Sequence, residues 1–79
     1  MIFETGFETM RAVAENSSFT KAAQQLGVTG PAVSKQIKQL EERLSLTLFH
    51  RTTRSVALTE SGKQLFSALE KSNEELSSL

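Results

Sequence analysis

The chain has 79 residues, with 9 Lys and Arg against 9 Asp and Glu, one His and no Cys. A domain of this length buries only about 60% of its unfolded surface, so its thin core depends on good helix packing or on a partner. The absence of Cys excludes disulfides, thiolate metal sites and a Cys nucleophile. No apolar run could span a bilayer and no signal-peptide core follows Met1, so we expect a cytoplasmic chain without a membrane partner.

The neutral total hides a segregation of charge along the sequence. Residues 1–19 and 55–79 each carry a net charge of −2, whereas residues 20–54 hold six basic and two acidic side chains, a net charge of +4. Nucleic-acid-binding domains usually have a basic total, so the sum alone argues against such a partner. A local positive field needs only local charge, which the central segment supplies.

Two helices are predicted in the first third of the chain. The first, about residues 4–15, has apolar residues at helical spacing: Phe3, Phe7, Met10 and Ala14. The polar residues 16–18 end it, and Thr20 is a candidate N-cap for a short second helix. That helix stops at Gly27, since glycine tolerates the left-handed backbone of a helix end.

A third helix follows after a very short turn, in which we expect Val28 to point inward. Thr29 caps this helix, about residues 30–44, and Pro31 suits its first turn because the missing N–H would be unpaired there anyway. One face is apolar, with Val33, Ile37, Leu40 and Leu44. The opposite face carries Pro31, Lys35, Lys38 and Glu42, with Ser34 at its margin.

A hairpin and a last helix complete the chain. Two short apolar runs, 46–51 and 56–58, flank the polar residues 52–55 and predict two paired strands. Thr59 then caps a helix that runs to the end of the chain. One stripe of that helix alternates steps of four and three, a coiled-coil rhythm over two heptads: Leu65, Leu69, Ser72, Leu76 and Leu79.

The break at Gly27 explains the polarity of the third helix. Two helices joined by a short turn form a helix-turn-helix, in which the second helix enters the major groove of DNA with its N-terminal residues foremost. Lys35 and Lys38 lie in that N-terminal half, whereas Glu41 and Glu42 lie further back. An ordinary solvated face would also account for the two lysines.

A hairpin after the recognition helix makes the domain a winged helix, with Arg51 and Arg54 at the wing. Arginine suits a narrow, negative minor groove or a bidentate phosphate contact. Glu41 is a candidate ion-pair partner of Arg51, so a structural role also explains these two residues. His50 is expected on the strand surface.

Two segments, SFTKAAQQLGVTGPAVSKQIKQLEERL and LFHRTTRSVALTESG, together resemble the N-terminal DNA-binding domain of LysR-type bacterial transcriptional regulators. The resemblance covers about residues 7–79. It implies a mainly α fold: a winged helix-turn-helix with a three-helix core and a two-stranded β wing in residues 1–58, then a long linker helix in 59–79. The family departs from this chain at Gly30, where many members have Gln, and at Ser45, where Gly is usual.

The resemblance also implies partners and site residues. They are double-stranded DNA with an interrupted palindromic operator, a homodimer formed through the last helix, and a tetramer in the full-length protein. A small-molecule effector would bind a C-terminal domain outside these residues, so no cofactor is expected in this chain. By position, the DNA contacts are Thr20, Thr29, Gly30, Pro31, Ser34, Lys35, Lys38, Arg51 and Arg54. The dimerisation residues are Leu65, Leu69, Leu76 and Leu79.

Two other classes of function compete with this interpretation. A protein-interaction module would explain the leucine stripe and the zero net charge, but neither the turn at Gly27 nor the basic helix face. An enzyme is disfavoured, because the sequence contains no G-x-S-x-G nucleophile motif and the small core leaves little room for a pocket.

Overall fold

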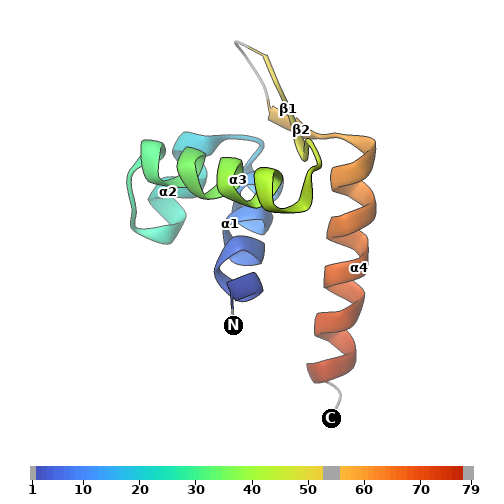
Figure 1. Ribbon diagram of the computed structural model, residues 1–79. Helices are drawn as coiled ribbons and strands as arrows, with labels where there is room; N and C mark the ends of the chain where they lie inside the picture. Colours follow the sequence, from blue (N-terminus) through green and yellow to red (C-terminus); the bar gives the residue numbers. More distant parts are fainter. Residues whose placement is uncertain (1, 53–55, 78–79) are drawn as a thin grey trace.

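The structure, a computed structural model, describes residues 2–52 and 56–77 (Figure 1). Its elements are α1 (Ile2–Asn16), α2 (Phe19–Leu26), α3 (Gly30–Leu44), β1 (Phe49–Arg51), β2 (Val56–Leu58) and α4 (Glu60–Ser77). The two strands pair antiparallel, with Phe49 opposite Leu58 and Arg51 opposite Val56. The predicted mainly α, winged helix-turn-helix fold is confirmed.

The ends of α2 are set by one side-chain cap and one left-handed residue. The Ser18 hydroxyl accepts a hydrogen bond from the Lys21 N–H at 3.1 Å, which makes Ser18 the N-cap. The prediction that Thr20 caps this helix is therefore wrong. Starting at Ser18 adds Phe19 to the helix, and the centres of the Phe19 and Phe49 rings lie 6.2 Å apart in an edge-to-face arrangement. Gly27 ends α2 with φ of 71°, as predicted.

Capping of α3 follows the sequence prediction closely. The Thr29 hydroxyl accepts from the Ala32 N–H at 3.2 Å, and Pro31 stands in the first turn. At the other end, Ser45 takes the left-handed conformation with φ of 55°, and its N–H donates to the Glu42 carbonyl at 3.3 Å. This conformation is sterically strained for a residue with a Cβ but not for glycine.

The core lies where α1, α2 and α3 meet, with the first strand of the wing closing one side. Its buried hydrophobic residues are Met10, Ala12, Val13, Ala22, Ala23, Val33, Ile37, Leu40, Leu48 and Phe49. Leu44, the last residue of the predicted α3 stripe, packs against this core while half-buried. Val28 is 42% exposed, so the prediction that it points inward is wrong. Leu26 packs against the core instead, and the turn at Gly27 carries the next residue to the surface.

The segment before the wing is tied to α3 by one carboxylate. Glu41 accepts hydrogen bonds from the backbone N–H groups of Leu48, at 2.7 Å, and Phe49, at 3.3 Å. The alternative in which Glu41 forms an ion pair with Arg51 is therefore wrong. The carboxylate satisfies two amides at the start of β1, where α3 and the wing join.

The start of α4 is tied to the same segment. The Thr59 N–H donates to the Leu48 carbonyl at 2.9 Å, and the Thr59 hydroxyl accepts from the Gly62 N–H at 2.9 Å. Thr59 thus caps α4, as predicted. A Cβ built on Gly62 would lie 2.3 Å from the Leu48 carbonyl oxygen, so this close approach requires glycine.

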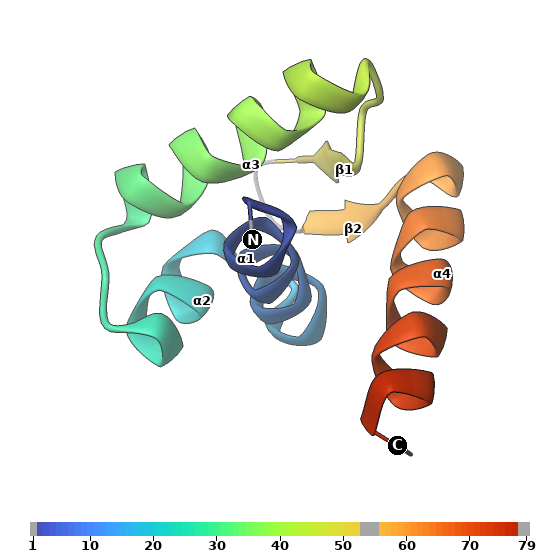
Figure 2. The ribbon, with the colours of Figure 1, turned by 60° about the horizontal axis from the view of Figure 1, so that its bottom comes forward.

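Helix α4 stands beside the three-helix cluster, on the far side from α2 (Figure 2). Arg11 on α1 forms an ion pair with Glu70 at 2.7 Å, and the rings of Phe7 and Phe66 lie 6.1 Å apart. Both chain termini lie at one end of the molecule, and the wing projects from the opposite end (Figure 1).

Replacing Ser45 with Gly should stabilise the fold by about 0.5–1 kcal/mol, because glycine adopts the left-handed conformation without steric cost. For a domain of this size, that raises Tm by roughly 3–6 °C. Thermal unfolding of Ser45→Gly and of the control Ser67→Gly, at an exposed position inside α4, measures the effect. The control should lose about 0.5 kcal/mol. A loss at both positions would contradict the role given to the backbone angle.

Replacing Glu41 with Ala should cost about 1.5–3 kcal/mol, because two amides lose a charged acceptor at the buried start of β1. The matched control is Glu42→Ala, since Glu42 is the next residue of the same helix and is exposed. Its effect should stay within about 0.5 kcal/mol. Urea unfolding of the two variants compares them directly, and equal free energies of unfolding would rule out the anchoring role.

Candidate nucleic-acid interface

The outer face of α3 is polar, basic and accessible. Lys35 and Lys38 are exposed and Ser34 is half-buried, whereas Val33 and Ile37 are completely buried on the inner face. Successive residues of a helix differ by about 100° in direction, so burial of the inner stripe fixes which side chains point outward. The predicted division of α3 into an apolar and a basic face is confirmed.

The first turn of α3 is open to a ligand. Thr29 and Pro31 are exposed, and a Cβ built on Gly30 would meet no atom within 4 Å. The unpaired N–H groups of a helix start, together with the helix dipole, favour an anion such as a phosphate. The Thr29 hydroxyl already accepts from the Ala32 N–H, so its acceptor capacity is partly used by the cap.

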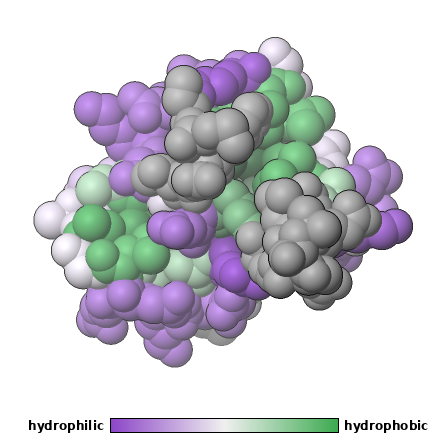
Figure 3. Space-filling model, turned by 90° about the horizontal axis from the view of Figure 1, so that it is seen from below, coloured by the Kyte–Doolittle hydropathy of each residue, from purple (hydrophilic) through white to green (hydrophobic). Residues whose placement is uncertain are grey.

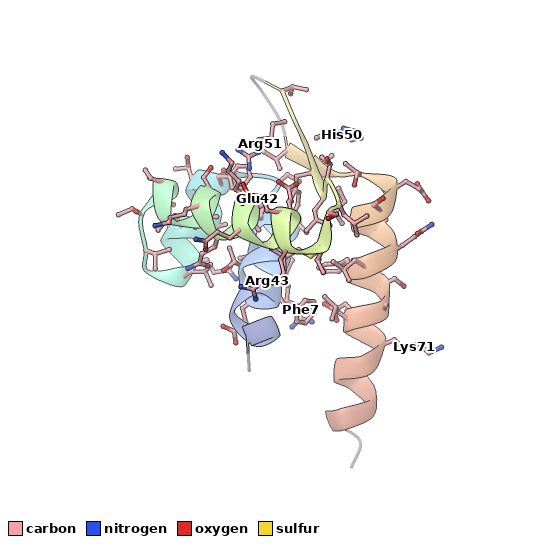
Figure 4. All side chains as sticks on the ribbon, viewed as in Figure 1. Phe7, Glu42, Arg43, His50, Arg51 and Lys71 are labelled. Atoms are coloured by element: carbon pink, nitrogen blue, oxygen red, sulfur yellow. The ribbon has the colours of Figure 1, made fainter. Side chains whose placement is uncertain are left out.

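Arg51 brings a guanidinium group from the wing to α3. It projects from β1 on the side opposite to His50, which is exposed as expected, while Arg43 points away from it (Figure 4). Its guanidinium carbon lies 4.3 Å from the centre of the Phe19 ring, and Nη1 lies 3.5 Å from the Ser34 hydroxyl oxygen. The structure therefore groups Ser34, Lys35, Lys38 and Arg51 on one side of the molecule.

Two further predicted contacts, Thr20 and Arg54, come from outside α3. Thr20 is exposed in the first turn of α2, where its hydroxyl is not needed for the cap. Arg54 lies outside the described residues, so its predicted contact stays a prediction. Phe19, whose ring lies under the Arg51 guanidinium, is not among the site residues predicted from the sequence. An aromatic residue directly before Thr20 is explained equally well as an ordinary core residue.

The predicted dimerisation stripe is only partly described. Leu65 and Leu69 are half-buried on α4, and Leu65 packs against the core. Leu79 and the side chain of Leu76 lie outside the described residues. Seen from the end that carries both termini, the molecule shows hydrophobic surface between hydrophilic residues (Figure 3).

Among residues 2–52 and 56–77, no three His, Asp or Glu side chains gather in a way that could hold a metal ion. None of the helices in these ranges combines the length and hydrophobicity needed to cross a membrane.

Comparison with known proteins gives the family. Residues 5–63 match the family described as "Bacterial regulatory helix-turn-helix protein, lysR family". The chain is 49% identical over 70 residues to the uncharacterized HTH-type transcriptional regulator YcaN of Escherichia coli (strain K12), covering 89% of this chain and 23% of that protein. It is 50% identical over 54 residues to the HTH-type transcriptional regulator CrgA of Neisseria meningitidis serogroup B, covering 68% of this chain and 18% of that protein. The chain thus spans about a fifth of the length of these relatives.

Solved structures agree with the sequence matches. The BenM DNA-binding domain, crystallised with benA site 1 DNA, superimposes with a TM-score of 0.85 at 34% identity, over 94% of this chain and 83% of that one. The CbnR DNA-binding domain in its DNA complex gives a TM-score of 0.84 at 27% identity, over 92% of this chain and 84% of that one. The resemblance drawn from the sequence motifs is confirmed. The chain belongs to the lysR family of bacterial regulatory helix-turn-helix proteins, and it has the fold of that family's DNA-binding domains.

Proposed function

We propose that this chain binds double-stranded DNA sequence-specifically as the DNA-binding domain of a LysR-type transcriptional regulator. Helix α3 lies in the major groove, and the wing lies over the flanking backbone or minor groove. The observation that carries the proposal is the exposed basic side formed by Lys35, Lys38 and Arg51 around Ser34. The DNA complexes of the similar BenM and CbnR domains support the same partner for this fold.

The geometry suits groove binding because the charges and the helix start face the same way. The major groove of B-DNA admits an α-helix and displays a different pattern of donors and acceptors for each base pair. Lys35 and Lys38 stand within the first nine residues of α3, so they lie near the phosphates when the helix enters by its N-terminus. Glu41 lies further from the N-terminus of α3 and accepts from the amides of Leu48 and Phe49, which keeps its charge away from the DNA.

Each proposed contact has a distinct role. Ser34 and Lys35 face base edges or nearby phosphates, while Lys38 and Arg51 neutralise the backbone. Thr20 on α2 and Thr29 at the α3 cap contact phosphates from their exposed positions. The full proposed set is Thr20, Thr29, Gly30, Pro31, Ser34, Lys35, Lys38, Arg51 and Arg54.

For the whole protein we propose a cytoplasmic regulator that pairs two copies through residues 59–79, with residues 1–58 as the DNA-binding unit. Two copies related by a twofold axis present two recognition helices to an interrupted palindrome. The half-buried Leu65 and Leu69 on α4 support this helix as the pairing element. Leu76 and Leu79 continue the proposed seam.

Binding to duplex DNA should depend steeply on salt. About six phosphates neutralised by a pair of subunits give a slope near −5 of log affinity against log salt concentration. Fluorescence anisotropy with a labelled duplex, selected from a random library, measures this slope. Affinity that hardly changes between about 50 and about 200 mM salt would contradict the proposal and favour a protein partner.

The variant Lys35→Ala should lose about 1–3 kcal/mol of binding free energy on the selected duplex and discriminate less against other sequences. Lys71→Ala, on the outward side of α4, is the matched control and should bind like wild type (Figure 4).

Replacing Gly30 with Gln should add a base contact. The site is sterically open, because a Cβ there meets no atom within 4 Å. A glutamine side chain can bond bidentately to adenine in the major groove, which is worth about 1–3 kcal/mol of discrimination. Selection from a random library should then show a new adenine preference at one position of each half-site. Gly30→Ala is the control and should leave the selected sequence unchanged. Identical selections for all three proteins would place the start of α3 outside the groove.

A further inference from the structure

An aromatic side chain outside the predicted site holds the wing arginine in place. We propose that Phe19 is a positioning residue for DNA binding: its ring holds the Arg51 guanidinium beside Ser34, ready for a backbone phosphate lying between α3 and the wing. This inference rests on the proposed function above. It adds a residue that itself touches no DNA, and it assigns the phosphate to the junction of α2, α3 and β1.

The Phe19 ring is itself held firmly. Phe19 is half-buried, and its ring packs edge-to-face with the Phe49 ring. The ring centres lie 6.2 Å apart and the angle between the ring planes is 66°. Phe49 is only 4% exposed, so it forms a fixed support. Residues two apart on a strand share a face, and Phe49 and Arg51 therefore both face α2. Phe19 packs on Phe49 and carries the exposed Arg51 guanidinium 4.3 Å from its ring centre.

The contacts of Arg51 leave its charge available. Within residues 2–52 and 56–77, the partners of its guanidinium are the neutral Phe19 ring and the neutral Ser34 hydroxyl. Arg11 provides an internal comparison, because it also lies over a phenylalanine, Phe7, at 5.6 Å. Arg11, however, pairs with the carboxylates of Glu15 at 3.4 Å and Glu70 at 2.7 Å, so its charge is compensated within the fold. Both arginines thus lie over a phenylalanine, but carboxylates compensate the charge of Arg11, whereas no carboxylate among the described residues pairs with Arg51.

The Arg51 guanidinium also orients the Ser34 hydroxyl. Its oxygen accepts from the Arg51 Nη1 at 3.5 Å, a long contact that orients the groups more than it binds them. The hydroxyl proton of Ser34 then remains free to donate to a second acceptor. Arg51 and Ser34 consequently present neighbouring donors, a pattern suited to phosphate oxygens.

Holding the guanidinium in place should increase affinity without adding charge. A free arginine side chain loses rotamer freedom when it binds, and a stacked one has already lost part of it. The worth of a cation–π contact at an exposed site corresponds to about a two- to fivefold change in an equilibrium constant. We expect this factor for each chain that contacts the DNA.

A double-mutant cycle tests the proposal on the selected duplex. Arg51→Ala should weaken binding and flatten the salt slope by about 0.9 for each bound chain, because one phosphate contact is lost. Phe19→Leu should weaken binding about two- to fivefold per chain and leave the slope unchanged, because the charge remains. In the Arg51→Ala background, Phe19→Leu should have no further effect. Phe19→Tyr keeps the ring and should bind like wild type. Circular dichroism at the assay temperature confirms that each variant is folded.

Different outcomes overturn different claims. Equal loss from Phe19→Leu in both backgrounds, or no loss in either, overturns the positioning role while DNA binding stands. A wild-type chain without salt-dependent binding to duplex overturns the proposed function and this inference together. If Phe19→Leu does not fold, Phe19→Met makes the same test, because methionine fills a similar apolar volume but has no aromatic face for the Arg51 guanidinium. It should keep the slope and lose affinity, and wild-type affinity would overturn the proposal.

Discussion

Burial of one face of α3 is the constraint on which the rest of the molecule depends. Val33 and Ile37 are completely buried, and Leu40 nearly so, which fixes the rotation of the helix about its own axis. With the helix in that rotation, the side chains of Lys35 and Lys38 point into solvent. A domain this small has little core to spare, so a single stripe of side chains both holds the fold and orients the proposed DNA-binding face.

The wing is placed relative to this face by a short chain of contacts. Glu41 accepts from the amides that open β1, and the Leu48 carbonyl accepts from Thr59 at the start of α4. From this anchored start, β1 needs only two more residues to carry Arg51 over Phe19 and next to Ser34. The same contacts therefore stabilise the fold and position the proposed site. We expect mutations that remove them to lower both the stability of the fold and the affinity for DNA.

Local signals made much of this structure predictable. The apolar stripe of α3, the glycine that ends α2 and the Thr29 cap each depend on residues a few positions apart, where periodicity and capping chemistry are reliable. Choosing Thr20 over Ser18 failed because both hydroxyls can cap a helix, and only the tertiary position of Phe19 decides between them. The alternative of an ion pair between Glu41 and Arg51 failed for a related reason. Their partners lie far along the chain or on the backbone, and sequence spacing carries no information about either.

In the proposed function, the outward face of α3, with Arg51 beside it, is the surface that contacts DNA. Mapping amide chemical-shift changes by NMR, as the selected duplex is added to the isotope-labelled chain, tests it most directly. We expect the largest changes on the first turns of α3 and on Arg51, while the amides around Lys71 on α4 barely move. Changes centred on α4, with the α3 amides unaffected, would contradict it.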